Sequence, residues 1–154
     1  MTPIKTTPLS FKIKEFNQLN TKELYAILQL RSEVFVVEQN CVYQDIDNKD
    51  QKALHILGYH EKNLVAYARI FKPYDYFKLA SIGRVVVALK YRKYRYGYAL
   101  MEAAIKAIQD YFKETNIAIS AQEYLEKFYT NLGFIKEGKS YLEDGIPHIY
   151  MVKM

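Results

Sequence analysis

Apolar and polar positions follow two different periods near the start of the chain. Residues 11–16 alternate between the two classes, which predicts a short strand with one buried face. Apolar side chains then recur at spacings of three and four up to Phe35, and Asn20 with Glu23 forms a capping box ahead of them, so we expect a helix. Arg31 interrupts the apolar stripe of this helix. The polar stretch 38–52 has no period and is predicted to be a loop.

The middle of the chain combines short apolar runs with a second helical pattern. Residues 55–60 and 64–71 flank the polar stretch EKN and are predicted to pair as a hairpin. The β-branched run 81–87 predicts a buried strand, and residues 117–121 predict another. Between them, helical spacing begins at Tyr98 and continues to about Glu114. A strand, a helix and a strand in this order favour a right-handed crossover, so the two strands are expected to be parallel and close together.

The remaining residues predict a short helix and two last strands. The helix covers residues 123–132, and Gly133 follows it as a C-terminal capping residue. Strands at 134–138 and 148–154 flank a turn at 143–147. Together the elements predict a mixed α/β fold in which most strand pairs are antiparallel.

Composition narrows the classes of protein that this chain can represent. A length of 154 residues suits a single domain, 1–154, and half of the residues are apolar, as in globular proteins. Cys41 is the only cysteine, so an internal disulfide is impossible, and no Cys/His cluster suggests a metal site. No apolar run has the length of a signal peptide core or a membrane span, so we expect a soluble, cytoplasmic protein without membrane partners. The net charge of +5 favours an anionic ligand.

Basic and aromatic residues gather where the second helix begins, in YRKYRYGYALM at 91–101. The first N–H groups of a helix lack intrahelical partners and lie at the positive end of its dipole, so they can hold a phosphate. Gly97 would let a ligand approach the backbone, and arginine can bind two phosphate oxygens at once. The stretch therefore predicts a pyrophosphate site, although a solvated basic turn is the alternative. Its candidate residues are Arg92, Lys93, Tyr94, Arg95, Tyr96, Gly97 and Tyr98.

Two motifs in this order resemble the GCN5-related N-acetyltransferases (GNAT). Motif A of that family is Q/R-x-x-G-x-G/A, between a strand and a helix; here Arg92 and Gly97 match its ends and Arg95 replaces the middle glycine. Motif B places a tyrosine before L-G-F, which matches Tyr129 and residues 132–134. Residues 20–154 also resemble the ElaA branch of the family.

The resemblance implies a GNAT fold, in which a mostly antiparallel sheet flanked by helices contains one parallel pair of strands that splay apart. It also implies that acetyl-CoA binds in this cleft, with its pantetheine arm on the backbone of Val85, Val86 and Val87 and its pyrophosphate on residues 92–98. The implied reaction is direct transfer of the acetyl group to the amine of a small molecule or peptide. Tyr129 would contact the coenzyme and act as general acid toward the leaving thiolate. Homodimers are common in this family.

No single residue identifies itself as the general base that would accept the amine proton. Glu38 is our candidate, with Glu33, His55, His148 and water relays as alternatives. Asp45, Asp47 and Asp50 could attract a cationic amine, but a solvated acidic loop is the simpler interpretation. Cys41 could form an acyl-enzyme. Nothing nearby in sequence would activate its thiol, although a base distant in sequence could lie close in space, and we favour direct attack.

Two other functions remain open on the sequence. Arginine, lysine and tyrosine in alternation could bind nucleic acid, but the basic excess is confined to about six residues, which suits a compact anion better. A domain that binds coenzyme A without catalysis is the second alternative, suggested by Arg95 at a glycine position.

Overall fold

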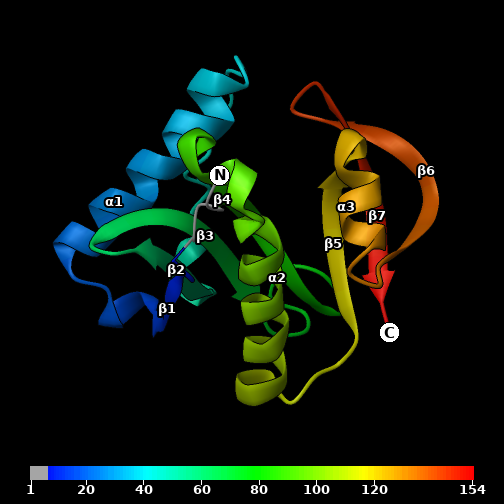
Figure 1. The fold of residues 1–154 in the computed structure, drawn as a ribbon. Helices are drawn as coiled ribbons and strands as arrows, with labels where there is room; N and C mark the ends of the chain where they lie inside the picture. The colour runs from blue at the N-terminus through cyan, green and yellow to red at the C-terminus, as the bar shows by residue number, and fades with distance from the viewer. Residues whose placement is uncertain (1–6) are drawn as a thin grey trace, which may run out of the picture.

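The computed structural model describes residues 7–154, which form one seven-stranded sheet with helices packed on it (Figure 1). The strands lie in the order β1-β2-β3-β4-β5-β7-β6, and β4 with β5 is the parallel pair. The strands are β1 (Ser10–Glu15), β2 (Leu54–His60), β3 (Asn63–Phe71), β4 (Ala80–Val87), β5 (Ile117–Gln122), β6 (Ile135–Glu143) and β7 (Ile146–Lys153). The α-helices are α1 (Thr21–Arg31), α2 (Tyr96–Ala107) and α3 (Glu126–Thr130). The shorter helical segments are η1 (Phe16–Gln18), η2 (Ser32–Glu38), η3 (Asp50–Lys52), η4 (Leu89–Tyr94), η5 (Ile108–Phe112) and η6 (Glu123–Leu125).

The predicted elements are all present, and the differences lie at their ends. The capping box forms as expected, because Asn20 accepts from the Glu23 N–H while the Glu23 side chain accepts from the Asn20 N–H. The first helix continues through η2 to Glu38, three residues beyond the predicted end. The second begins at Tyr96, and Gly133 takes a positive φ of 95° after α3, as a C-terminal glycine does. The mixed α/β fold and its single parallel pair are therefore confirmed.

Alternate residues of the central strands face two separate helices. Ile56 and Ala68 point toward α2 and its Leu100, in the larger core cluster. Leu57 and Tyr67, one position away, pack against α1 on the other face. The two-residue period of a strand thus places α1 and α2 on opposite faces of the same strands.

The sheet opens between β4 and β5. These strands pair at only two positions, Ala80 with Ile117 and Ser81 with Ala118, and then separate. Figure 1 shows the two resulting groups, with β1, β2 and β3 on one side of α2 and β5, β7 and β6 on the other. The edge of β4 beyond Ser81 therefore has no strand partner on the β5 side.

A β-bulge changes the direction of β4 at the start of this opening. Between the pairs Tyr67–Val86 and Arg69–Gly83, two residues of β4 face the single residue Ala68 of β3. One of them, Arg84, has a φ of 52°, in the left-handed region. Such a bulge bends a strand and leaves backbone groups outside the ladder.

Arg95 also has a left-handed conformation, at the junction of η4 and α2. Its φ and ψ are 61° and 23°, values that glycine adopts without steric cost. The arginine therefore occupies the motif A glycine position with the backbone geometry of a glycine. Its guanidinium lies 4.8 Å from the centre of the Tyr98 ring, a cation–π contact that offsets part of the cost.

Replacing Arg95 with glycine should stabilise the fold relative to replacing it with alanine. Both variants lose the guanidinium and its contact with Tyr98, but only alanine keeps a Cβ in the left-handed region. We expect Arg95→Gly to exceed Arg95→Ala by about 1 kcal/mol in free energy of unfolding. Urea denaturation of the two variants measures this difference. Equal midpoints would show that the Cβ carries no cost at this junction.

Candidate active site

A cavity occupies the opening between β4 and β5. Its volume is about 510 Å³, and its wall includes residues 82–87 of β4 and Ile119, Ser120 and Gln122 of β5. Two groups of residues close it. The end of η4 and the start of α2, together with η6 and α3, contribute Arg92, Lys93, Arg95, Gly97, Tyr98, Tyr124, Leu125, Phe128 and Tyr129. The end of η2 and the β6–β7 turn contribute Glu38, Gln39, Cys41, Tyr43, Glu143, Asp144, Ile146 and His148.

The tertiary structure brings most of the predicted site residues to this cavity. Residues 85–87, Arg92, Lys93, Arg95, Gly97, Tyr98, Tyr129 and Glu38 all line it. Tyr94 and Tyr96 do not; they line a second, more open cavity beside Leu9 and Phe11. Tyr96 is buried and donates a hydrogen bond to the carbonyl of Thr7 at 2.7 Å, so its side chain packs the helix onto the N-terminal segment.

Gly97 is in close contact with another part of the protein. A Cβ at this position would lie 3.3 Å from the edge of the Phe128 ring. Phe128 in turn packs against Tyr98, with ring centroids 4.7 Å apart. The missing side chain thus lets α2 and α3 approach at one end of the cavity, in addition to the ligand access expected from the sequence.

Arg92 is bound to Glu38 across the cavity wall. Its two terminal nitrogens donate to the two carboxylate oxygens, at 2.5 and 2.9 Å, and its Nε donates to the Val87 carbonyl at 2.9 Å. This bidentate pair joins the end of η2 to the end of β4. The candidate base and the candidate phosphate ligand are therefore partners in this structure.

Tyr129 projects from α3 into the apolar part of the wall. It is 6% exposed and packs edge-on against Phe128 and Phe134, with centroids 4.9 and 6.1 Å away. Burial raises the pKa of Tyr129 well above its usual value, and Tyr124 adds to the rise. The phenol is thus protonated throughout the neutral range and can donate a hydrogen bond into the cavity.

Two contacts connect the end of the first helix to the far half of the sheet. Gln39 and Gln122 exchange amide hydrogen bonds, at 3.2 and 3.3 Å. The Cys41 thiol donates to the carbonyl of Asp144 at 3.3 Å. Both contacts cross the opening where β4 and β5 no longer pair. The Cys41 thiol thus connects the segment after η2 to the β6–β7 turn.

His148 lies at the β6–β7 end of the cavity. Its Nδ1 is 2.7 Å from the Ile146 carbonyl and its Nε2 is 3.2 Å from a Glu143 oxygen. Tyr141 stacks on the ring and shares a hydrogen bond with Ser120. Of this group, only His148 was a candidate from the sequence. Ser120 and Gln122 alternate with apolar residues along β5, and this alternation was the sequence signal for a polar face of that strand.

The other two candidate bases lie away from the cavity. His55 is fully buried between Tyr67 and the carbonyl of Asp50, with contacts of 2.6 and 2.9 Å. Glu33 is exposed on η2 and is absent from the cavity wall. Glu38 and His148 are therefore the sequence candidates that the fold brings to the site.

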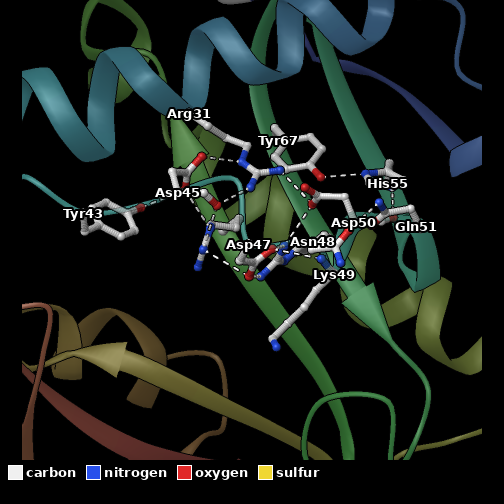
Figure 2. A network of polar contacts seen from close by, with 12 residues as sticks. Arg31, Tyr43, Asp45, Asp47, Asn48, Lys49, Asp50, Gln51, His55 and Tyr67 are labelled. Atoms are coloured by element: carbon white, nitrogen blue, oxygen red, sulfur yellow. Dashed lines mark hydrogen bonds and ion pairs between the residues drawn. The ribbon is translucent and has the colours of Figure 1, made fainter.

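The stretch that we expected to be a solvated acidic loop is the core of a buried ion cluster (Figure 2). Arg31 binds Asp45 and Asp50, each at 2.8 Å, from the underside of the first helix. Arg69 binds Asp50 and Asp47 at 2.9 and 2.6 Å. That interpretation was wrong, as was a role for these carboxylates in attracting an amine, because three arginines neutralise three aspartates. The third arginine is Arg84, 2.8 Å from Asp45.

The cluster reaches the cavity through Tyr43 and Arg84. The Tyr43 hydroxyl donates to Asp45 at 2.7 Å, and the Arg84 guanidinium lies 5.8 Å from the centre of the Tyr43 ring. Both residues line the cavity. Arg84 is itself the left-handed residue of the β4 bulge, and its ion pairs hold it in place. The cluster therefore fixes part of the cavity wall.

Residues 17–154 match the family model described as "Acetyltransferase (GNAT) domain". The chain belongs to the GNAT family. The Escherichia coli (strain K12) protein ElaA is 44% identical over 139 residues, which are 89% of this chain and 91% of ElaA. The solved structure of E. coli ElaA has a TM-score of 0.88 and 40% identity, covering 95% of this chain and 99% of ElaA.

A second solved structure gives the same result. The acyl-CoA N-acyltransferase from Pseudomonas aeruginosa has a TM-score of 0.89 and 40% identity, with 95% of this chain and 99% of that chain covered. The expectations of a GNAT fold and of an ElaA-like member of the family are both confirmed. The separation of β4 from β5 and the cavity between them are therefore features of a GNAT fold in this protein.

Within 7–154 there is no group of three or more His, Cys, Asp or Glu side chains arranged to hold a metal ion. No helix in the same range is long and apolar enough to cross a membrane.

The ion cluster should make the stability of this GNAT protein depend on acidity. Burial disfavours ionised Asp47 and Asp50, but hydrogen bonds and charge from Arg69 and Arg31 outweigh it and lower both pKa values below 3.8. A carboxyl with a lowered folded-state pKa stabilises the fold above its unfolded pKa, and this stability is lost as the pH falls. The free energy of unfolding should therefore be steady above about pH 5 and decline at lower pH.

Asp50→Asn tests this directly, since it leaves Arg31 and Arg69 buried with one charge partner fewer. We expect a loss of about 3 to 5 kcal/mol in free energy of unfolding at neutral pH and a shallower acid decline. Urea titrations from pH 3 to 7 measure both. Asp110→Asn, at an exposed helix pair with Lys106, is the matched control and should leave the curve unchanged. A variant as stable as the unaltered protein would mean that the cluster does not hold the loop.

Proposed function

We propose that this protein transfers an acetyl group from acetyl-CoA to an amine of a small molecule or peptide by direct attack. The observation that carries the proposal is the cavity between β4 and β5, where an unpaired strand edge, basic side chains and a buried tyrosine converge. Membership of the GNAT family supports N-acyl transfer.

The residues at one end of the cavity suit the coenzyme. Lys93 and Arg95 line it beside the first turn of α2, so their charge and the free N–H groups of the helix act together on a phosphate. Arg92 is the third cation and becomes available when it releases Glu38. We assign the pyrophosphate to this end, with backbone or side chains of Arg92, Lys93, Arg95, Gly97 and Tyr98, and the pantetheine arm to the free edge at Val85, Val86 and Val87.

The chemistry needs little more than alignment of two reactants. The amine nitrogen forms a bond to the thioester carbon, the carbon–sulfur bond breaks, and the sulfur leaves with the electron pair. Holding reactants in line contributes up to about 7 to 11 kcal/mol in favourable models. The amine loses its proton to a carboxylate or to water, and the thiolate gains one.

Tyr129 is our candidate donor to the leaving sulfur. Its raised pKa keeps the phenol protonated and neutral, so no negative charge forms in the apolar wall before the reaction. A phenol with so high a pKa transfers its proton to a thiolate unfavourably, since thiols have a pKa near 8.5. Its contribution is therefore mainly a hydrogen bond to the sulfur as charge develops, at the lower end of general-acid effects, about 10²-fold.

The positions of the basic side chains argue against the two alternative functions, nucleic-acid binding and coenzyme binding without catalysis. A surface for nucleic acid needs cations spread over one face, whereas Arg92, Lys93 and Arg95 line a cavity. Arg95 keeps a glycine-like backbone, so its presence in motif A gives no reason to expect an inactive domain.

Binding of the coenzyme is the first test of this function. Calorimetry of the purified protein with acetyl-CoA should show saturable binding in the micromolar range, because several charged contacts converge on one pyrophosphate. Assays for coenzyme A release with a panel of primary amines then identify the acceptor. Lack of binding at millimolar acetyl-CoA, or tight salt-sensitive binding to an oligonucleotide instead, would refute the proposal.

Tyr129→Phe should lower turnover while leaving the fold and the coenzyme affinity in place. The change removes one hydroxyl and keeps the packing on Phe128 and Phe134. We expect kcat to fall by about 10²-fold with little change in KM for acetyl-CoA. Tyr111→Phe, at an exposed position outside the cavity, is the matched control. Unchanged turnover across pH would remove Tyr129 from the mechanism.

A further inference from the structure

The Glu38–Arg92 ion pair joins two side chains to which we have given separate roles, Arg92 toward the phosphates and Glu38 as the candidate base. Arg92 occupies the motif A position expected to bind phosphate, yet its fork of two N–H donors is filled by the carboxylate of Glu38. An arginine fork binds two oxygens of a carboxylate or two oxygens of a phosphate in the same geometry. Glu38 and a pyrophosphate therefore compete for the same side of Arg92.

The pair is accessible enough to exchange. The side chains of Arg92 and Glu38 are 37% and 31% exposed, in contrast to the ion cluster behind β4, where Arg31 and Arg69 are completely or almost completely buried. Ion pairs with this exposure contribute little to stability. The Nε bond to the Val87 carbonyl can hold the arginine in place while its fork changes partner.

A released Glu38 would leave a negative charge in the cavity. Arg92 is the only basic side chain within ion-pairing distance of Glu38 among residues 7–154. Its neighbours at the η2 end already have partners, since the Gln39 amide bonds Gln122 and the Cys41 thiol bonds the backbone carbonyl of Asp144. At the β6–β7 end the cavity has two further acids, Glu143 and Asp144, and His148, which faces Glu143. A cationic ligand would therefore neutralise the acidic side chains on this side of the cavity.

We propose that Glu38 binds the ammonium group of the acceptor, and that Arg92 holds Glu38 until the pyrophosphate of the acyl-CoA takes its place. The inference rests on the proposed function, since it needs a coenzyme to release the carboxylate. It makes the two substrates cooperative: bound coenzyme frees the anion that the amine uses, and a bound amine removes the competitor of the phosphate. By thermodynamic linkage the two effects are equal in size.

The first test is the affinity of the free protein for coenzyme A. Glu38→Gln removes the competing carboxylate and leaves Arg92 intact, so the variant should bind coenzyme A roughly three- to tenfold more tightly than the unaltered protein. Pantetheine, which lacks the phosphates, should bind both proteins equally. Glu33→Gln, one turn earlier on η2 and outside the cavity, controls for the loss of a negative charge.

The outcomes separate this inference from the proposed function. If the unaltered protein binds no coenzyme A, the proposed function fails. If it binds coenzyme A and Glu38→Gln binds with equal or lower affinity, then Arg92 and Glu38 form a structural tie and only the exchange is refuted. A gain for pantetheine as large as that for coenzyme A would also refute exchange with phosphate.

The second test measures the acceptor side with 1,5-diaminopentane as the ammonium probe. Calorimetry with and without saturating coenzyme A should show tighter diamine binding to the coenzyme complex, by roughly the same three- to tenfold factor. In Glu38→Gln this difference should disappear. Diamine affinity that does not respond to coenzyme A, or no diamine binding to the complex at all, would overturn the assignment of Glu38 to the acceptor.

Discussion

The separation of β4 from β5 after two residue pairs is the constraint on which the rest of the site depends. A continuous sheet would satisfy the backbone of both strands and leave no room between them. Here the edge of β4 keeps free backbone groups along a cavity of about 510 Å³, and side chains from both faces of the sheet reach it. The loss of pairing over a few residues therefore makes room for the cavity.

The separation needs support from side chains, since unpaired strands do not hold their own positions. On one side the ion cluster of three arginines and three aspartates fixes the bulge at Arg84 and the wall residue Tyr43. On the other, Gln39 and Cys41 contact Gln122 and the Asp144 carbonyl across the opening. A cluster in which each charge has a partner resists movement, because breaking one pair exposes an uncompensated buried charge.

Buried and exposed ion pairs have different roles in this protein. The pairs of Arg31 and Arg69 are shielded from water and define a fixed wall. The pair of Arg92 and Glu38 lies in the cavity wall, partly hydrated, and joins a motif A residue to the end of the first helix. Burial therefore distinguishes charges that hold the architecture from charges that are free to change partner.

Local signals in the sequence determined the elements and the two motifs. Periodicity gave each strand and helix to within a few residues, the Asn20 capping box formed as predicted, and the motifs placed Tyr129 and most of residues 92–98 at one site. The tertiary structure alone decided that Asp45 and Asp50 are buried, that Arg92 binds Glu38, and that Tyr94 and Tyr96 turn away from the cavity. The physical reason is that a period reports how one residue relates to its near neighbours. Which charge meets which, across tens of residues, is fixed only when the sheet and helices pack.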